Sequence, residues 1–429
     1  MLIPVHTAHD SHAASPMQST AAASRRYDLD GLRVLAFGLL IFYHTGMLYV
    51  GRWGFHFKSQ YLSSSLEYLM LLSSPWRMLL IWFISGYALG AVMQHFAGWR
   101  YVLQFGLRRT VLLLLPLLVG LWLIVPPQLY AEMVQKDGLS MSYWQFYQAF
   151  FDLQHPLFAE YQSGVWPHVD VNHLWFLRSL WQFTLLALVL MPLLHSRLLQ
   201  QGCRWFCQLA LPWQLLAWSV LMLLIRTEFT GDARRELQGF AVFLLGLLVV
   251  RQPGFWQQLA QSRRWLGWLC LLNYAVMCCW YFFAYQPEQL PLALQPAIEP
   301  GLLLSFSVQA IAMLFWLLAL AQHYLNKPHP KLALANRLVF PVYLLHQSLI
   351  IMAALWLTPY ALGGAAEAIL VLLFTLCASA LCLLLCWNLP WLAPLVGLRT
   401  PYPFSAGWRK AGLACGVLLV TPLALTLLF

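Results

Sequence analysis

Long runs of apolar residues are the feature of this sequence that most restricts how it can fold. A transmembrane helix needs about 20 consecutive apolar residues, so each such run predicts one span. Only 9% of the 429 residues are charged, whereas soluble domains have roughly 25%. We therefore predict an all-α polytopic membrane protein, a bundle of about 10–11 transmembrane helices. The predicted spans lie near 32–50, 76–96, 106–126, 173–195, 209–226, 237–251, 264–284, 301–324, 335–357, 364–388 and 409–429.

Lysine and arginine residues concentrate at alternate ends of these spans. With the N-terminus in the cytoplasm, seventeen of them fall on the cytoplasmic side and eight on the outer side, as the positive-inside rule requires. We therefore expect a cytoplasmic N-terminus, and we attribute the net charge of +10 to topology rather than to nucleic-acid binding. Residues 1–26 are predicted to form a disordered cytoplasmic tail, 27–390 the transmembrane domain, and 391–429 a C-terminal loop and an additional transmembrane helix.

One long connection, residues 127–172, joins the third and fourth predicted spans on the outer side. Long connections with their own aromatic content are usually functional or locally folded. This one is predicted to be either a sugar-binding surface or an aromatic belt at the membrane interface. Its aromatic and acidic residues are Tyr130, Tyr143, Trp144, Phe146, Tyr147, Tyr161, Trp166, Asp137, Asp152, Glu160 and Asp170.

The first span begins with Arg33 and carries His44 eleven residues later. Eleven residues make about three helical turns, so both side chains share a face and lie roughly 16–17 Å apart. Polar groups inside membrane helices normally face the bundle interior or a wet cavity. His44 is a candidate general base or an interhelical hydrogen-bond partner, and Arg33 a functional residue or a cytoplasmic anchor. Asp30 is predicted to cap the helix, to orient Arg33 or to bind substrate.

Two further groups lie at outer ends of spans. Arg77 opens the second span and either binds a carboxylate or anionic acceptor or snorkels at the interface. The small residues Ser85 and Gly86 in the same span are predicted to permit close helix packing. His173 and Trp175 mark the outer mouth of the fourth span, as acid/base or sugar contacts or as interfacial residues.

The remaining candidates lie in the third and ninth spans. His346 and Gln347 are at membrane depth, where such a pair needs partners or water. Arg108 and Arg109 open the third span at the cytoplasmic face, where they suit phosphate recognition or topology signalling. The sequence has no Cys/His cluster with metal spacing, and none of the nine cysteines lies in a predicted outer loop, so we expect neither a metal site nor a disulfide.

Together these stretches resemble the membrane acyltransferase-3 family over about residues 27–390. The matching motifs are Arg33-(ten residues)-His44, Asp28–Arg33, Phe83–Gly86, His173–Leu177 and Tyr343–Gln347. Trp53–His56 makes the chain most similar to the branch around glucan biosynthesis protein C. The family often has an Arg-x-x-Arg pair before its third helix, whereas Arg108 and Arg109 are adjacent here. The resemblance implies ten core helices, with His44 catalytic and Arg33 its essential partner.

The resemblance also implies transfer of acetyl or succinyl groups from cytoplasmic acyl-CoA to extracytoplasmic glycans, at a bacterial inner membrane. We therefore expect no bound cofactor, acyl-CoA as co-substrate, a glucan or other polysaccharide as acceptor, and His44 as base or as acyl-histidine nucleophile. A transporter or flippase for a glycan or lipid-linked sugar, or a sensor without catalysis, remains the alternative. The predicted site residues are His44, Arg33 and Asp30 for catalysis; Arg33, Arg108 and Arg109 for acyl-CoA; and Arg77, His173, Trp175, His346 and Gln347 for the acceptor.

Overall fold

The computed structural model describes residues 25–159, 171–399 and 404–428, and every regular element in these ranges is helical. Residues 1–24 of the predicted tail lie outside them, as do Glu160, Tyr161, Trp166 and Asp170 of the predicted outer connection. The helices are α1 (Tyr27–Met47), α2 (Ser64–Leu71), α3 (Arg77–Met93), α4 (Trp99–Val119), α5 (Pro126–Lys136), α6 (Tyr143–Phe151), α7 (Trp175–Val189), α8 (Met191–Leu194), α9 (Arg197–Gln208), α10 (Leu211–Glu228), α11 (Gly231–Leu248), α12 (Pro253–Tyr285), α13 (Ile298–Tyr324), α14 (Leu332–Leu357), α15 (Gly364–Asn388) and α16 (Ala406–Leu428).

The predicted all-α membrane fold is confirmed, because each apolar run coincides with a helix. Among the described residues, six helices are long and apolar enough to cross a membrane, or seven if the bent pair α9–α10 is one span. Helices α3 and α7, with 17 and 15 residues, are shorter, and α1 and α11 carry charged residues near their starts. The count of 10–11 spans therefore stays a prediction.

The connection predicted over 127–172 is partly helical. Helix α4 continues through a π-helical turn, Gly120–Ile124, into α5, and Pro126 stands at the first helical position, where proline is well tolerated. Helix α6 then packs its aromatic face against α5, so that Phe146 and Phe150 are fully buried in a small local core. Much of the aromatic content of this connection is therefore used for packing, whereas Trp144 remains 71% exposed.

Close packing of α3 on α11 is made possible by glycines on both helices. A Cβ added at Gly86 would lie 1.9 Å from the carbonyl oxygen of Phe243, and one at Gly246 would lie 2.1 Å from that of Phe83. Neither backbone oxygen has room to yield, so only glycine permits this approach. The structure confirms the packing role predicted for Gly86.

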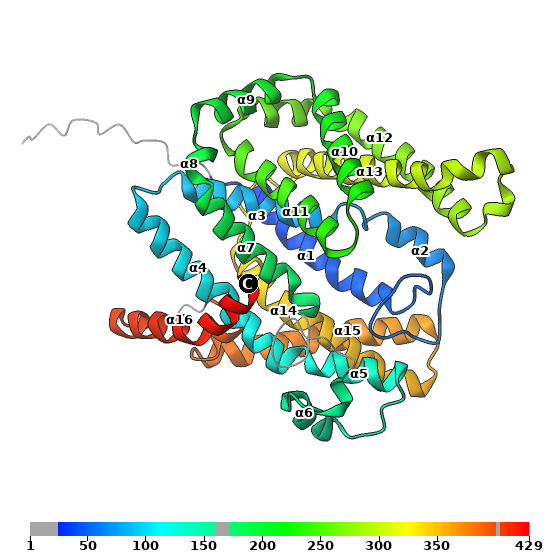
Figure 1. Cartoon of the computed structure of the whole chain (residues 1–429), viewed down its shortest axis with the longest axis vertical. Helices are drawn as coiled ribbons and strands as arrows, with labels where there is room; N and C mark the ends of the chain where they lie inside the picture. The colour runs from blue at the N-terminus through cyan, green and yellow to red at the C-terminus, as the bar shows by residue number, and fades with distance from the viewer. Residues whose placement is uncertain (1–24, 160–170, 400–403, 429) are drawn as a thin grey trace, which may run out of the picture.

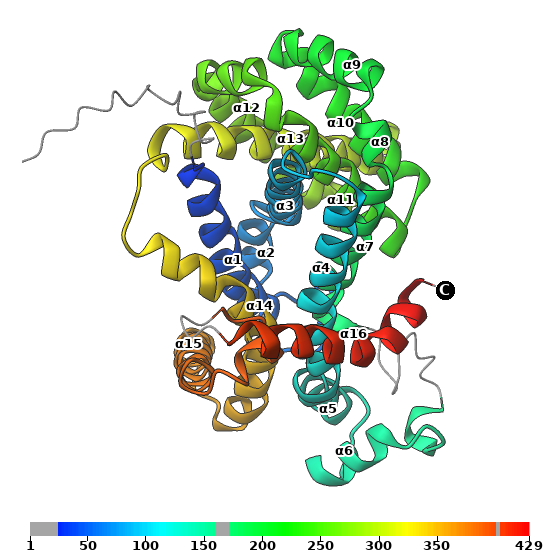
Figure 2. The same cartoon turned by 90° about the vertical axis from the view of Figure 1, so that its left-hand side faces the viewer.

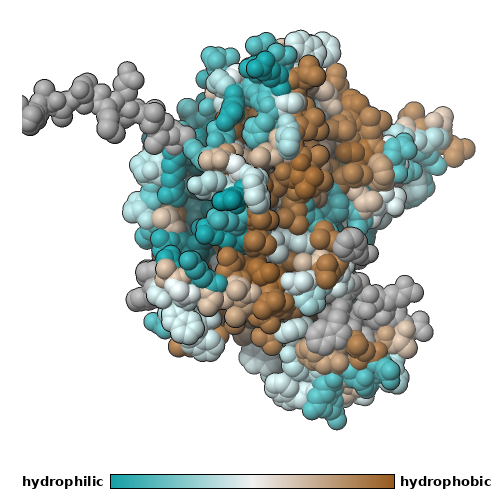
Figure 3. Space-filling view, turned by 60° about the vertical axis from the view of Figure 1, so that its left-hand side comes forward, coloured by the Kyte–Doolittle hydropathy of each residue, from teal (hydrophilic) through white to brown (hydrophobic). Residues whose placement is uncertain are grey.

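Five helices, α1, α3, α4, α7 and α14, are arranged around a common centre (Figures 1 and 2). Helix α1 packs on α14, α13 and α3, while α15 and α16 pack outside, on α14 and α4 respectively. The surface carries a broad hydrophobic area beside a hydrophilic side (Figure 3), as expected of a molecule that lies in a bilayer. The predicted site residues lie on these helices, except His173, which lies in the 3₁₀ turn Asn172–Leu174 directly before α7.

Candidate functional site

Two histidines from distant parts of the chain meet in the centre of the bundle. His44 on α1 places its Nδ1 2.9 Å from Nε2 of His346 on α14. Nδ1 of His346 lies 2.6 Å from the carbonyl oxygen of Tyr343, one turn earlier on the same helix. His346 is only 1% exposed. The two rings therefore form a chain of hydrogen bonds that ends on the backbone.

This chain determines where the protons lie. A carbonyl oxygen only accepts hydrogen bonds, so Nδ1 of His346 carries a hydrogen, and the Nε2 of a neutral His346 must accept one. The donor is then Nδ1–H of His44, which leaves Nε2 of His44 with a free lone pair. Within the described residues nothing is hydrogen-bonded to that nitrogen. His346 thus orients His44 so that its free Nε2 faces away from His346.

The connection between α1 and α2 folds over this pair near the end of α1. Phe55 stacks on His44 with ring centroids 6.2 Å apart and an interplanar angle of 10°. The next residue, His56, is bound to Glu132 of α5 at 2.6 Å. Lys58 donates to the carbonyl oxygens of Met47 (2.8 Å) and Val50 (2.5 Å) at the end of α1. Sequence reasoning noted Trp53–His56 only as part of a resemblance and missed Lys58.

His173 lies beside the pair, but both of its ring nitrogens are bound by the protein. Nε2 is 3.0 Å from the carbonyl oxygen of Leu344, and Nδ1 is 3.0 Å from Nε2 of Gln128. The same Gln128 amide also donates to Ser348 at 2.6 Å, and it accepts from Gln347 at 3.1 Å. This buried network joins α5, α14 and the 3₁₀ turn Asn172–Leu174 just before α7. Roles in substrate binding for His173 and Gln347 stay predictions.

Arg77 and Trp175 lie in different surroundings. The guanidinium carbon of Arg77 is 3.3 Å from the ring centroid of Tyr43, whose ring is 5.8 Å from that of His44. Arg77 is therefore a cation close to the histidine pair. Trp175 instead packs against Trp82 and lies under Arg235, whose guanidinium carbon is 3.9 Å away.

A cleft of about 540 Å³ opens at the opposite end of the same five helices. Apart from its arginines, the wall is largely apolar, and it includes Ser85 of the Phe83–Gly86 motif. Arg109 lines it, whereas its neighbour Arg108 is exposed outside it, so the structure separates the two residues that the sequence pairs. The arginines that line the cleft are Arg25, Arg33, Arg109, Arg337 and Arg399.

Arg33 is held in this cleft by two partners. It donates through Nε to Oδ1 of Asn336 on α14 at 2.8 Å, and it lies 3.6 Å from Asp30. Asp30 also pairs with Arg25 at 2.7 Å. The prediction that Asp30 caps α1 is wrong, because the helix begins three residues earlier, at Tyr27. Asp30 orients arginines instead.

An aromatic layer separates the cleft from the histidine pair. Phe37 and Phe176 line the inner end of the cleft, and their ring centroids are 5.6 and 5.8 Å from that of Tyr343. Tyr343 is the residue whose carbonyl oxygen binds His346. Arg33 and His44 are roughly 16 Å apart along α1. One helical face therefore joins the two parts of the site.

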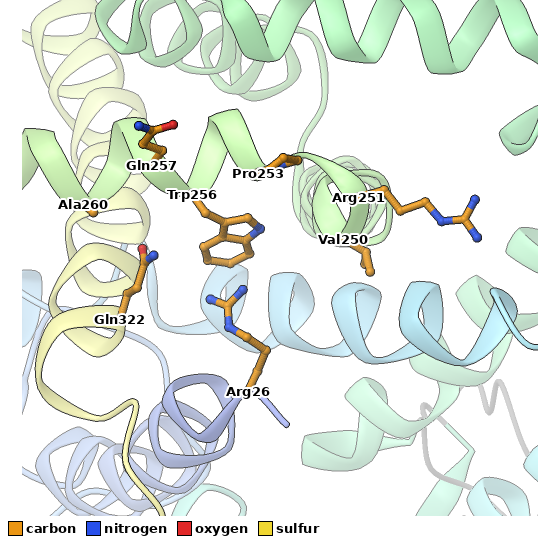
Figure 4. A pocket seen from close by; sticks show the side chains of 8 residues that line it. All are labelled: Arg26, Val250, Arg251, Pro253, Trp256, Gln257, Ala260 and Gln322. Atoms are coloured by element: carbon orange, nitrogen blue, oxygen red, sulfur yellow. The ribbon is translucent and has the colours of Figure 1, made fainter. Parts of the chain in front are cut away.

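A second cleft, of about 600 Å³, lies between Arg26 just before α1, the 3₁₀ turn Val249–Arg251 after α11, and helices α12 and α13 (Figure 4). Its cation Arg26 points at Trp256, with its guanidinium carbon 3.8 Å from the ring centroid. Arg26 is also ion-paired at 2.6 Å with the fully buried Asp28. Arg251 also lines this cleft, so it has two arginines against five in the first. The first cleft is therefore better suited to an anionic ligand.

The described residues contain no group of three or more His, Cys, Asp or Glu side chains placed to hold a metal ion. In comparisons with known proteins, the family model of the acyltransferase-3 family, described as an acyltransferase domain, matches residues 26–389. No curated protein and no solved structure matches the chain.

Proposed function

Since the chain belongs to the acyltransferase-3 family and is a membrane acyltransferase, we propose that it moves an acetyl or succinyl group from cytoplasmic acyl-CoA to a carbohydrate hydroxyl outside the cytoplasm. The observation that carries the proposal is the free Nε2 of His44 at the end of the Tyr343–His346–His44 hydrogen-bond chain. A positioned imidazole with a free lone pair is the usual general base.

The reaction begins when Nε2 of His44 takes the proton of the acceptor hydroxyl. The oxygen attacks the thioester carbonyl carbon, and the carbon–sulfur bond breaks as the tetrahedral intermediate collapses. His44 then returns the proton to the departing thiolate, so the products are the ester and free CoA. The positive charge on His44 is supported through the bond to His346 while the intermediate exists.

The arginine cleft is the proposed entry of the donor. CoA carries several phosphate charges. Among the five arginines of the cleft, Arg25 and Arg33 share Asp30 as an ion-pair partner, and the described residues give the other three no ion pair. Arginines suit phosphate because their planar guanidinium forms paired, charge-assisted hydrogen bonds. With the phosphates at the arginines, the thioester arm points along α1 towards His44. The aromatic layer around Phe37 is the barrier that the arm must pass.

The acceptor is proposed to reach His44 from the opposite side, where Phe55 covers the ring. Arg77, beside Tyr43, is the cation best placed to meet a negatively charged acceptor or a succinyl carboxylate. We propose a periplasmic glucan as acceptor, because Trp53–His56, the segment that covers His44, carries the resemblance to the glucan branch. With acyl-CoA in the cytoplasm and the glucan in the periplasm, we propose that the protein lies in a bacterial inner membrane with its N-terminus in the cytoplasm.

The test is release of free CoA by the purified full-length protein in vesicles supplied with acetyl-CoA or succinyl-CoA and a glucan. Replacement of His44 by Ala should reduce acceptor-dependent release by at least about 10²-fold, the usual contribution of a general base, while binding of acyl-CoA persists. Full activity in H44A would refute the assignment of the base. A wild-type protein that moves glycan without consuming acyl-CoA would indicate a transporter instead.

Acyl-CoA without acceptor separates the two chemistries in a single turnover. A general base leaves the protein unmodified, whereas an acyl-histidine intermediate transfers the acyl group to His44 with release of one CoA. Intact-protein mass spectrometry reads the difference directly. We expect unmodified protein, because the proposed direct transfer forms no bond between His44 and the acyl group.

A further inference from the structure

One wall of the arginine cleft comes from chain that follows the family-matched domain. The match ends at residue 389, and the next segment makes a 3₁₀ turn, Ala393–Val396, before reaching Arg399. Ala393 is 1% exposed and Leu398 is 4% exposed, because both pack with the end of α15 and with α14. The residue immediately before Arg399 is therefore anchored in the core.

A glycine directs this segment towards the cleft. Gly397 has φ +66°, a backbone conformation that glycine adopts without strain. A Cβ at this position would lie 2.2 Å from Cε1 of Phe340 on α14. Phe340 itself lines the cleft. The turn at Gly397 thus packs the segment against the cleft wall and determines the position of the Arg399 backbone.

The following helix holds the segment from its other side. Gly416 of α16 packs against Val111 of α4, and Nε2 of Gln182 on α7 donates to the carbonyl oxygen of Leu427 at 3.0 Å. Since α4 and α7 both line the cleft, the C-terminal region is fastened to the same helices that form the site. Its contribution to the cleft is a fixed feature of the fold.

Arg399 adds its charge where positive charge is already concentrated. It lies close enough to Arg33 and to Arg109 for its charge to repel theirs. No carboxylate among the described residues forms an ion pair with Arg399 or Arg109. Like charges gathered in this way are unfavourable by themselves and become favourable when a polyanion binds between them.

We propose that Arg399, which lies outside the family-matched domain, binds a phosphate of the acyl donor at the mouth of the cleft. This inference rests on the proposed function, since it takes acyl-CoA as the donor. Arg399 is exposed, whereas the thioester must travel inward to His44, so the phosphate-bearing end is the part of the donor that Arg399 meets. Arg399 determines donor affinity and has no part in the chemical step.

The experiment compares the full-length wild type with R399Q, using acetyl-CoA and S-acetyl-pantetheine, which carries the same thioester but no nucleotide phosphates. Loss of one charge-assisted contact should weaken acetyl-CoA binding roughly tenfold, with kcat at saturating donor unchanged. The reaction with S-acetyl-pantetheine should be the same in both proteins. R399K should recover part of the affinity, because it keeps the charge.

R409Q is the matched control, because Arg409 is an exposed arginine of α16 outside the cleft; it should bind acetyl-CoA like the wild type. Equal acetyl-CoA affinity in R399Q and wild type would overturn the inference and leave the proposed function intact. An equal loss with S-acetyl-pantetheine would also overturn it, because the role would then be structural. Failure of the wild type to use any acyl-CoA would instead overturn the proposed function.

Discussion

At the scale of single residues, the polar side chains in these apolar helices are bound in chains of hydrogen bonds that specify which atoms remain free. His173 has both nitrogens bound, while His44 has one bound and one free. The two histidines look alike in the sequence, since each is a polar residue in an apolar run. The difference arises from neighbours distant in the sequence, such as His346, which is 302 positions from His44.

A substitution at His346 tests its role as the residue that positions His44. H346A removes the acceptor for Nδ1–H of His44 and should lower kcat by about 10²-fold, within the range of general-base catalysis. The KM for acyl-CoA should stay unchanged, because the cleft lies roughly 16 Å away along α1. H346Q, whose side-chain oxygen can accept the same hydrogen bond, should retain more activity. A raised KM with unchanged kcat would make His346 a donor-binding residue instead.

We predict that the stability of the protein depends on pH through Lys58, which lies in a connection outside the membrane spans. Burial lowers the pKa of its ammonium group from 10.5 to about 8. Below pH 8 both folded and unfolded chains carry the proton, so burial of the charge is fully unfavourable. Between pH 8 and 10.5 the unfolded chain binds more protons, so this group makes folding more favourable as the pH rises.

The measurement is the thermal unfolding midpoint in detergent between pH 7 and 10. The stability of the wild type relative to K58M should increase over the upper part of this range. K410M, which changes an exposed lysine of α16, should follow the wild type throughout. Parallel curves for wild type and K58M would show that Lys58 does not titrate there.

At the scale of helices, the position of the site depends on how closely α3 approaches α11. Gly86 and Gly246 bring the two backbones into contact, and this contact leaves the opposite side of α3, with Ser85 and Ile84, facing the arginine cleft. Small residues in an apolar run predict close packing. They do not identify the partner helix, which is set by the fold.

We predict that G86A destabilises the protein, because the added methyl group would lie 1.9 Å from a backbone oxygen of α11. Overpacking typically costs about 1–3 kcal/mol, and more where the neighbour is backbone. The unfolding midpoint should fall, and acyl-CoA binding should weaken as the cleft wall shifts. G412A is the control, because a Cβ at Gly412 on α16 meets nothing within 4 Å. Equal stability of the two variants would contradict the packing argument.

At the scale of the whole molecule, positive charge and the histidine pair lie at different depths of one helical ring. The cleft arginines come from the first turns of α1 and the residues just before it, from the middle of α4, from the first turns of α14 and from the connection before α16. This is the end that the positive-inside rule assigns to the cytoplasm. A donor from one compartment and an acceptor from the other can then meet at His44.

For the whole molecule we predict that the N-terminus lies in the cytoplasm and the C-terminus outside it. An epitope tag at the N-terminus should be protected from protease in intact spheroplasts, whereas a tag after Phe429 should be cleaved. An odd number of spans requires the two ends to lie on opposite sides. Protection of both tags would mean an even number of spans, and cleavage of the N-terminal tag alone would invert the proposed compartments of donor and acceptor.

Local properties of the sequence determined that the chain is a helical membrane protein and that Arg33 and His44 share one face of a helix. Hydropathy and the helical repeat depend on residues within a few turns of one another, so both can be determined from the sequence alone. Only the tertiary structure decided that His44 binds His346, that Arg109 and not Arg108 lines the cleft, and that Arg399 joins Arg33. These contacts unite residues up to about 370 positions apart, and they depend on which helix faces meet, which is settled by packing across the whole bundle.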